Sequence, residues 1–461
     1  MNENVIGIDL GTSSVKVLQK FADGSVRKAK ERYQDVSITG WLDAISQALA
    51  KLDLTGTAAI GLSSQVGTYI VNDRDIISWN CKAGANEVQE IKQRFKPETF
   101  LREISMDHPS IASYPIPRLM YIKEHYDPIA TVCQPKDYIC QWLTGNRVTD
   151  PYSWRGLANL EKKSYSAFFL EVLGIREDML PRLTDCTGFA GVTKEIPLPG
   201  KLLPANIPVY VGLNDYYAAL LGMGIGNTGD LFDISGTSEH LGVIEDRIVS
   251  GTSLVSGPYI KHNVHYGVTA SSGASMQFGL QLADGAACDL EKMHKTHPPV
   301  FLPYVNGERA PIWDPDARGM FFGIGENCTQ EDLAYAVFEG VVFSLYHIYE
   351  TMGSPEVKAM VVSGGAAVSE SLNALKAEMF GIPVITLEEN DTSALGAALV
   401  AAVGALWYPD LEAAAAASVK IKKTVIPTGD HQKWLRERYS LYKELYPAVK
   451  DQYARLKELR S

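Results

Sequence analysis

Two short segments combine a turn-forming glycine with hydroxyl side chains, which is a combination suited to phosphate. In the first, Asp9-Leu10-Gly11-Thr12-Ser13-Ser14, glycine lets the backbone turn close to a ligand. The amides and hydroxyls that follow it can line up on phosphate oxygens. Asp9 cannot contact a phosphate directly, so it would hold Mg²⁺ or its waters. Taken alone, the segment could equally be an ordinary turn.

The second segment, Asp233-Ile234-Ser235-Gly236-Thr237-Ser238, repeats this arrangement in the other half of the chain. Each glycine turn lies between two apolar runs that read as strands, so each segment is predicted to be the turn of a β-hairpin. Two such hairpins could hold the phosphates of one nucleotide. The pair is therefore stronger evidence for a phosphate site than either segment alone.

A carboxylate follows a third apolar strand, in Gly212-Leu213-Asn214-Asp215, where a helix of small residues begins. Asp215 could simply cap that helix. Alternatively it could be a general base, taking the proton of a hydroxyl as the oxygen attacks the γ-phosphorus of ATP. The residues alone leave both roles open.

A fourth segment ends the strand at 359–362 with Ser363-Gly364-Gly365-Ala366-Ala367. Side chains this small leave a flat backbone surface that is open to a planar base. They could equally serve tight packing between a strand and a helix.

The elements around these segments alternate between strands and helices. Hydrophobic spacing predicts strands at 5–10, 15–18 and 58–62 and a helix at 41–52. In the second half it predicts helices at 329–349, 371–380 and 393–406 and strands at 359–362 and 383–387. Residues 73–204 are irregular and rich in helix signals, as expected of an insertion that shapes a binding site. The long charged helix at 431–459 is interpreted as docked on the second half, with partner binding as the alternative.

Composition narrows the class of protein. The 461 residues are 46% hydrophobic and 21% charged, which is typical of a globular protein, and they exceed what one core usually holds. A formal charge of -11 argues against nucleic acid or an anionic membrane as a partner. Neither a leader-like N-terminus nor a membrane-length apolar run is present, so we expect a cytoplasmic protein. The six cysteines lack a C-x-x-C pair and are interpreted as reduced thiols.

Two familiar nucleotide signatures do not explain the sequence. No G-x-x-x-x-G-K-[ST] motif occurs. A G-x-G-x-x-G motif begins at Gly224, but it follows a helix and precedes a strand, the reverse of the dinucleotide-binding order. It is therefore interpreted as a chance match.

Together these segments resemble the FGGY carbohydrate kinases of the actin, hexokinase and Hsp70 ATPase superfamily. IGIDLGTSSVK and DISGTSEHLG are similar to the two phosphate motifs, GLNDYYAALLG to the segment with the catalytic Asp, and VVSGGAA to the adenosine motif. GMFFGIGENCTQEDLAYAVFEGV is similar to the C-terminal signature of the family, and FLPYVNGERAPIWDPDARG looks like the stretch before it in xylulokinases and gluconokinases.

The resemblance implies an α/β fold of two actin-like (ribonuclease H-like) lobes that flank a nucleotide and sugar cleft. Residues 1–222 would form the sugar-binding lobe with the catalytic base, and 223–461 the ATP-binding lobe with the C-terminal helix. Asp215 would be catalytic, and Asp9 and Asp215 would hold Mg²⁺. The residues expected to bind ATP are Asp9, Gly11, Thr12, Ser13, Lys16, Gly236, Thr237, Ser238, Gly364, Gly365 and Ala366.

The sequence departs from the family on the sugar side. Gln65-Val66-Gly67-Thr68 stands where xylulokinase-like members have Gln-Met-His-Gly, and Trp79-Asn80-Cys81 where W-N-D is usual. TDPYSWRG places Trp154 where small residues are common. The expected sugar-binding residues are Gln65, Val66, Trp79, Trp154, Asn214 and Asp215.

The resulting prediction is an ATP-dependent kinase of a small sugar, with D-xylulose as the first candidate. Another ketose such as sedoheptulose, an aldonate such as gluconate, or a polyol is the alternative. A homodimer is expected by family analogy. The rival from another class is a non-catalytic, actin-like ATP switch, which would leave Asp215 and the insertion at 73–204 without a role.

Overall fold

The computed structural model describes residues 3–106, 108–109, 111–236, 238–282 and 296–459. Its contacts divide the chain into two compact units. Unit 1 comprises Met1–Gly224 and Asp391–Val419, and unit 2 comprises Ile225–Asn390 and Lys420–Ser461. Each unit is built around a mixed β-sheet.

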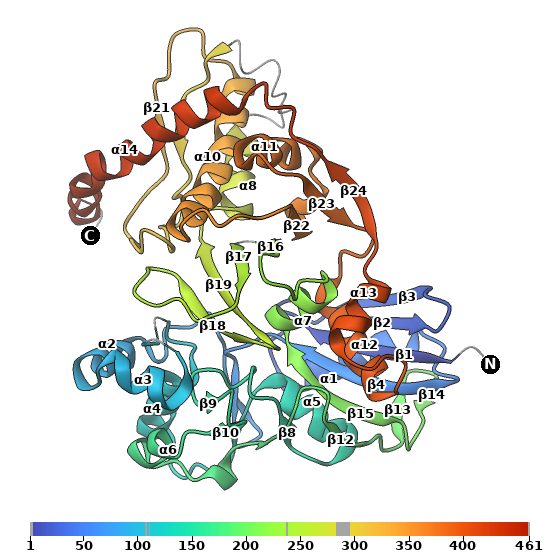
Figure 1. The fold of residues 1–461 in the computed structure, drawn as a ribbon. Coiled ribbons are helices and arrows are strands. Elements are labelled where there is room, and N and C mark those ends of the chain that lie inside the picture. Colours follow the sequence, from blue (N-terminus) through green and yellow to red (C-terminus); the bar gives the residue numbers. More distant parts are fainter. Residues whose placement is uncertain (1–2, 107, 110, 237, 283–295, 460–461) are drawn as a thin grey trace. The chain divides into compact units, whose positions relative to one another are not determined.

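The sheet of unit 1 has the order β12-β15-β4-β1-β2-β3. Strand β1 pairs antiparallel with β2 and parallel with β4, and β15 runs parallel to β4 (Figure 1). The predicted hairpin and the strand after it are confirmed, whereas β3 was not predicted. The strands are β1 (Asn4–Leu10), β2 (Ser14–Phe21), β3 (Val26–Arg32), β4 (Thr57–Ser64), β12 (Phe189–Val192) and β15 (Pro208–Asn214).

Helices cover both faces of this sheet. Successive side chains of a strand point to opposite faces, and Ile6 and Ile8 lie in one core with Trp41 of α1. On the other face, a Cβ at Gly7 would lie 2.2 Å from the carbonyl oxygen of Ala394, so glycine is what lets α12 approach. Figure 1 shows α7 beside α12. The helices of the sheet are α1 (Ile38–Ala50), α5 (Pro135–Thr144), α7 (Asp215–Gly222), α12 (Thr392–Gly404) and α13 (Leu411–Ser418).

The segment between β4 and β15 forms a separate core of short elements, in agreement with the predicted insertion. Its helices are α2 (Ala85–Arg94), α3 (Pro97–Ile104), α4 (Pro115–His125) and α6 (Ala167–Leu173), with a 3₁₀ turn at Glu177–Met179. The strands of the segment are β5 (Tyr69–Val71), β6 (Asp75–Ile77), β7 (Val132–Cys133), β8 (Val148–Thr149), β9 (Ala158–Asn159), β10 (Ser164–Tyr165), β11 (Arg182–Leu183), β13 (Ile196–Leu198) and β14 (Lys201–Leu203). Of these, β13 and β14 pack in the core of the sheet.

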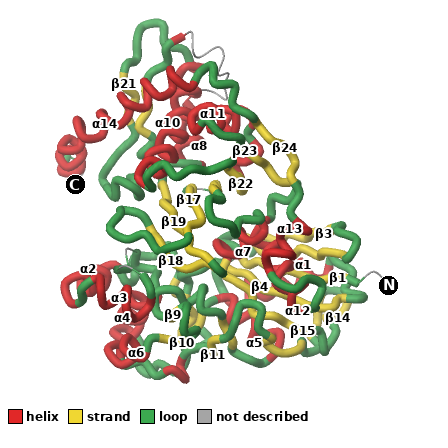
Figure 2. Tube along the Cα trace, viewed as in Figure 1, coloured by secondary structure: helices red, strands yellow, loops and turns green. Residues whose placement is uncertain are grey.

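The sheet of unit 2 has the order β18-β19-β17-β16-β22-β23-β24. Strand β16 pairs antiparallel with β17 and parallel with β22. Figure 2 draws the strands of this unit in yellow and its helices in red. The strands are β16 (Leu231–Ser235), β17 (Glu239–Glu245), β18 (Val255–Tyr259), β19 (His262–Thr269), β22 (Met360–Gly364), β23 (Val384–Leu387) and β24 (Ile421–Val425). Strands β20 (Val300–Leu302) and β21 (Met320–Phe322) pair apart from this sheet.

Helices pack on this sheet as the hydrophobic spacing predicts. The C-terminal helix α14 buries Tyr439 and Tyr442 in the core of unit 2, and the hydroxyls of Tyr442 and Tyr304 are 2.8 Å apart. The docked interpretation of this helix is therefore confirmed. The helices are α8 (Gly273–Leu282), α10 (Gln330–Thr351), α11 (Glu370–Phe380) and α14 (Gln432–Glu458), with a 3₁₀ turn at Gly365–Val368.

The two units share one pattern, in which an antiparallel hairpin is followed by a strand parallel to its first member. β1, β2 and β4 have this relation in unit 1, and β16, β17 and β22 have it in unit 2. The units differ from the predicted lobes in one segment, since 391–419 packs in unit 1 although it follows most of unit 2 in the chain. Its helix α12 contacts β1, β4 and α7.

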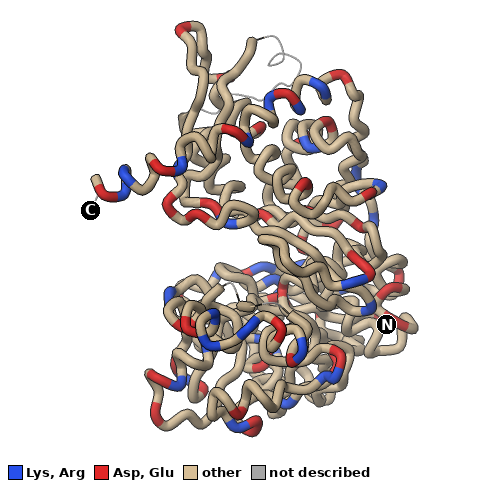
Figure 3. Tube along the Cα trace, turned by 60° about the vertical axis from the view of Figure 1, so that its left-hand side comes forward, with Lys and Arg blue, Asp and Glu red and all other residues tan. Residues whose placement is uncertain are grey.

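Charged residues of both signs are scattered over the chain (Figure 3). Within the described residues, no helix is long and apolar enough to cross a membrane.

Candidate active site

Asp215 occupies the first position of α7, at the point where β15 ends. The helix cap is the residue before it, because Asn214 Oδ1 accepts a 3.0 Å hydrogen bond from the Tyr217 N–H. Asn214 Nδ2 donates to the Tyr152 carbonyl at 3.1 Å. Both groups of the Asn214 amide are thus engaged in structure, and Asp215 does not provide the cap.

The Asp215 carboxyl group has the electrostatic environment of a proton acceptor. Burial, reinforced by the negative charge of Asp9, raises its pKa to about 7. Backbone N–H groups of Tyr216 and Val66 donate to the carboxylate and oppose this shift, with the Tyr216 bond at 2.9 Å. A base with a pKa near neutrality can both accept and release a proton under ordinary conditions.

Asp9 lies at the end of β1, on the sheet face that packs against α12. It is buried and accepts a 2.9 Å hydrogen bond from Ser63 Oγ on β4. Burial raises the pKa of Asp9, while Lys16, its cross-strand partner, opposes the rise. Lys16 also pairs with Asp391 at 3.0 Å, so this predicted ATP ligand has a carboxylate partner.

The Gly11 turn leaves its hydroxyls accessible. The Gly11 N–H donates to the Ser14 carbonyl at 3.0 Å, and Thr12 and Ser13 between them are exposed. The Tyr33 hydroxyl donates to the Gly11 carbonyl at 2.6 Å and so helps to fix the position of the turn. The geometry suits a phosphate ligand, as the residue types predict.

The predicted sugar-binding residues fall into two groups. Val66 is 39% exposed and Trp79 is partly exposed, while Gln65 is buried directly beside Val66. Trp154, in contrast, is fully buried, and its indole N–H donates to Asp137 at 3.1 Å. Trp154 is therefore a core residue, and the proposed sugar contacts do not include it.

The Gly236 turn of unit 2 also has a hydrogen bond from the glycine N–H across the turn, but to a carbonyl two residues on, whereas in the Gly11 turn the bond reaches three residues on. The Gly236 N–H donates to the Ser238 carbonyl at 2.8 Å. The predicted ligand Thr237 lies outside the described residues. Asp233 points away from this turn, since it is fully buried and paired with Lys376 of α11.

An open pocket of ≈ 520 Å³ adjoins this turn. Ser235 Oγ organises one wall, donating to the Ser363 carbonyl and accepting from the Ala366 N–H, both at 2.9 Å. Apolar side chains and small residues form most of the lining, as a planar base requires. The lining residues are Gly236, Gly273, Met276, Gln277, Leu280, Gln281, Gly365 and Ala366.

The structure thus brings together Gly236, Gly365 and Ala366 as predicted, and adds residues of α8 that were missed. Met276 and Leu280 are spaced i, i+4, as are Gln277 and Gln281, so all four lie on neighbouring positions of one helix face. This i, i+4 spacing was the signal in the sequence from which the helix face could have been predicted. Without the fold, nothing linked it to the hairpin 40 residues earlier.

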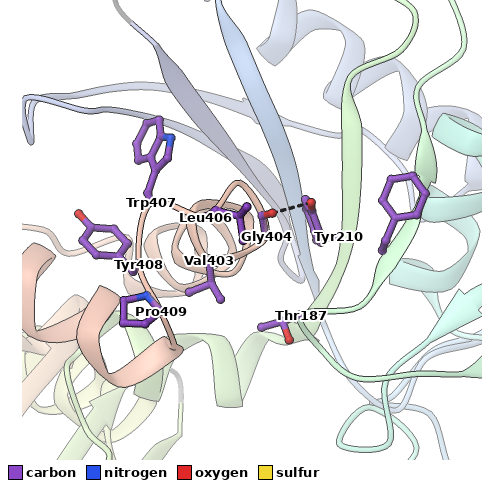
Figure 4. A pocket seen from close by; sticks show the side chains of 9 residues that line it. Thr187, Tyr210, Val403, Gly404, Leu406, Trp407, Tyr408 and Pro409 are labelled. Atoms are coloured by element: carbon purple, nitrogen blue, oxygen red, sulfur yellow. Dashed lines mark hydrogen bonds between the residues drawn. The ribbon is translucent and has the colours of Figure 1, made fainter.

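A further pocket of ≈ 590 Å³ lies in unit 1 beside the end of α12 (Figure 4). Tyr210 donates to the Gly404 carbonyl at 2.6 Å in its wall, and Trp407 and Tyr408 come from the loop after the helix. It contains none of the predicted site residues, and we assign it no role in the reaction.

A magnesium ion would find two carboxylates in unit 1. Asp9 and Asp215 interact electrostatically, and burial disfavours the ionised form of both. Mg²⁺ typically takes one or two carboxylates and completes its shell with water and phosphate oxygens. The pair therefore fits Mg²⁺, whereas the described residues hold no cluster of three or more His, Cys, Asp or Glu suited to a metal.

Comparison with known sequences shows the family to which the chain belongs. Residues 4–222 match the N-terminal domain of the FGGY family of carbohydrate kinases, and residues 233–405 match its C-terminal domain. A xylulose kinase of Lactococcus lactis is 28% identical, with 96% of each chain covered. A glycerol kinase of Thermococcus onnurineus is 27% identical over 89% of this chain and 91% of that protein.

Solved structures share the fold. A ligand-bound xylulose kinase from Lactobacillus acidophilus superimposes with a TM-score of 0.85 and 24% identity, covering 98% of this chain and 100% of that one. A gluconate kinase from the same organism gives 0.84 and 23%, covering 99% and 100%. The expected α/β fold of two actin-like lobes is confirmed.

Fold and site therefore define an ATP-dependent phosphotransferase that acts on an alcohol group. The chain belongs to the FGGY family of carbohydrate kinases.

Proposed function

We propose that this kinase transfers the γ-phosphate of ATP to a hydroxyl of a small sugar, with Asp215 as the general base. The observation that carries the proposal is the position of Asp215 at the end of β15, where burial and Asp9 raise its pKa to about 7. Such a carboxylate takes the hydroxyl proton as the oxygen attacks phosphorus.

Each unit contributes a different part in this proposal. The pocket beside α8 in unit 2 would hold adenine, and the Gly11 and Gly236 turns would bind the phosphates. Gln65, Val66 and Trp79 would contact the sugar beside Asp215, which Asn214 positions as the helix cap. The assignment of 1–222 to sugar binding and of 223–461, without the segment 391–419 that packs in unit 1, to ATP binding is part of the same proposal.

Asp9 and Asp215 would hold Mg²⁺, directly or through water. Bound there, the cation would offset the negative charge that develops on the phosphate oxygens. A cytoplasmic location and a homodimer stay predictions.

D-xylulose is the first candidate substrate, because xylulose kinases are prominent among the relatives. The test is an ADP-release assay with Mg-ATP against ketopentoses, ketohexoses, heptuloses, aldonates and polyols. A strong signal that disappears in Asp215→Asn names the substrate. A signal with gluconate or glycerol in place of xylulose would replace the first candidate, and ATP turnover that ignores every acceptor would contradict the proposal.

The reaction rate is expected to rise with pH through about 7. The protonated form of Asp215 cannot accept the hydroxyl proton, so kcat/KM for the sugar should fall tenfold per pH unit below the midpoint. Asp9→Asn removes the neighbouring charge that helps to raise the pKa of Asp215. We therefore expect a lower pKa of Asp215 in that variant, measured by titration of the protein without Mg²⁺, because Asp9 is also a proposed ligand of the cation. A wild-type midpoint below pH 5 would show that another group, or none, acts as the base.

A further inference from the structure

A buried ion pair lies behind the catalytic strand and takes no part in the chemistry proposed above. Lys136 Nζ is 2.9 Å from Asp150 Oδ2 and 3.8 Å from Oδ1 of Asp137, and all three side chains are inaccessible to solvent. Lys136 also lies in the first turn of α5, where the helix dipole disfavours a cation. Burying two charges gains little stability over apolar residues. The role of the pair therefore follows from the neighbouring groups to which Lys136 and Asp150 form hydrogen bonds.

One of these groups is a backbone carbonyl in the strand that leads to Asp215. The register of β15 against β4 shifts between Tyr210 and Leu213, which marks a β-bulge. Gly212 adopts a φ of 79°, and a Cβ there would lie 1.7 Å from the Leu62 carbonyl oxygen. Lys136 Nζ donates to the Val211 carbonyl within this bulge at 3.2 Å. Bulges beside active sites re-aim the side chains that follow them.

A second path runs through the turn that follows Asp150. The Asp150 carboxylate accepts from the Ser153 N–H at 3.0 Å and from Ser153 Oγ at 2.5 Å. Within this turn, the Tyr152 carbonyl accepts from Asn214 Nδ2 at 3.1 Å. Asn214 caps α7, and the α7 backbone supplies the Tyr216 N–H to Asp215.

A third path reaches Asp215 from the opposite segment. The Ser153 carbonyl accepts from Gln134 Nε2 at 2.6 Å, and Gln134 Oε1 accepts from the Gly67 N–H at 3.3 Å. The residue before Gly67 is Val66, whose backbone N–H donates to the Asp215 carboxylate. The Tyr216 and Val66 donors therefore belong to different segments that are tied to one turn.

We propose that Lys136 and Asp150 are positioning residues for the Asp215 carboxylate: their ion pair fixes the 150–153 turn and the β15 bulge, and through them the Tyr216 and Val66 N–H groups. This inference rests on the proposed role of Asp215 as the base. A displacement of about 1 Å at a reacting group can cost about 10²-fold in rate, so the effect should appear in kcat.

The test separates positioning from stability by neutralising the pair in two ways. Lys136→Met leaves Asp150 charged, buried and unpaired, and should lower both the melting temperature and kcat. Lys136→Met with Asp150→Asn leaves Asp137 as the remaining charge, and Asp137 keeps its hydrogen bonds from the Gln134 N–H and the Trp154 indole, so we expect the melting temperature to recover part of that loss. Because the Val211 carbonyl still lacks its donor, kcat should stay at least tenfold below wild type, with the KM for Mg-ATP within twofold.

Arg147→Met provides the control in the same unit. Arg147 pairs with Asp73 at 2.7 Å, and none of its described side-chain bonds leads to the turn or to the bulge. Its loss should leave kcat within twofold of wild type. If kcat of the double variant recovers together with its melting temperature, or Lys136→Met keeps wild-type kcat, the ion pair serves stability alone and the inference is wrong.

Amide hydrogen exchange gives a readout that needs no substrate. Peptides covering 64–68 and 213–218 should exchange at least fivefold faster in the double variant than in wild type, while peptides of unit 2 remain unchanged. Wild-type protection of those two peptides would overturn the inference. Should the charge variants not fold, Gln134→Met cuts the third path without touching a charge, and it should speed exchange at 64–68 and in the first turn of α5, which Gln134 caps, but not at 213–218.

The outcome is distinguishable from failure of the proposed function. Full activity of Asp215→Asn would show that Asp215 is not the general base and would contradict the proposed function. If Asp215→Asn is inactive but the double variant is fully active, Asp215 keeps its role as the base and only the positioning role of Lys136 and Asp150 is contradicted.

Discussion

Replacing Asp215 with asparagine is expected to lower kcat for sugar phosphorylation by about 10²- to 10⁴-fold, which is the usual contribution of a general base. Asparagine keeps the shape of the side chain and can still accept from the Tyr216 and Val66 N–H groups. It cannot take the hydroxyl proton. ATP affinity, measured by calorimetry without Mg²⁺, should change by less than threefold, because Asp215 would act on ATP only through the cation and the pocket beside α8 belongs to unit 2.

The same variant should be more stable than wild type at pH 8. The pKa of Asp215 is about 7 in the folded protein and 3.8 in an unfolded chain, so folding favours the protonated form. Its stabilising contribution is complete below pH 3.8 and is lost as the pH rises to 7. Above pH 7 the ionised, partly buried carboxylate costs on the order of 1 to 3 kcal/mol after allowance for solvent.

Thermal unfolding at two pH values checks this sign. Asparagine removes the cost of the buried charge, so the melting temperature should rise by about 2 to 4 °C per kcal/mol at pH 8. The gain should shrink towards pH 5. A variant that loses activity and also melts lower at pH 8 would indicate that Asp215 holds the fold together rather than serving the reaction.

The sequence predicted correctly those features that depend only on residues close together in the chain. Gly11 and Gly236 mark hairpin turns because each is flanked by apolar strands, and both turns are present, each with a bond from the glycine N–H across the turn. Asp215 was found because a carboxylate directly follows a buried strand. Its competing role as a cap could not be settled, since Asn214 and Asp215 are both good caps. Only the bond from Tyr217 to Asn214 separates them.

Contacts between distant segments were beyond the sequence. Trp154 looked like a sugar contact from its place in an unusual motif, yet it packs edge-on against Tyr69 and Tyr165 in a buried core. The packing of α12 in unit 1 depends on glycines some 170 to 390 residues away, including Gly7 and Gly222. Hydrophobic spacing identifies α12 as a buried helix but does not identify the sheet that buries it.

The close packing at Gly364 yields the second large effect. Gly364 ends β22 with a φ of 89°, and a Cβ there would lie 1.9 Å from the Ser235 carbonyl oxygen of the adjacent strand. Gly364→Ala must push the two strands apart, and Ser235 would lose its 2.9 Å bond to the Ala366 N–H. Since that bond shapes the wall of the pocket, we expect ATP to bind at least tenfold more weakly, a loss of about 1.4 kcal/mol or more by calorimetry.

The control for backbone strain is Gly353→Ala in the same unit. Gly353 has the same φ of 89°, but a Cβ there would meet no atom within 4 Å. Both variants place alanine at a positive φ and should lose stability, on the order of 1 to 3 kcal/mol for such sparsely populated conformations. Only Gly364→Ala should also lose ATP affinity, because only there does the added methyl group collide with the backbone that supports the pocket. Equal ATP affinity in the two variants would place the nucleotide away from β22 and contradict the proposed adenine site.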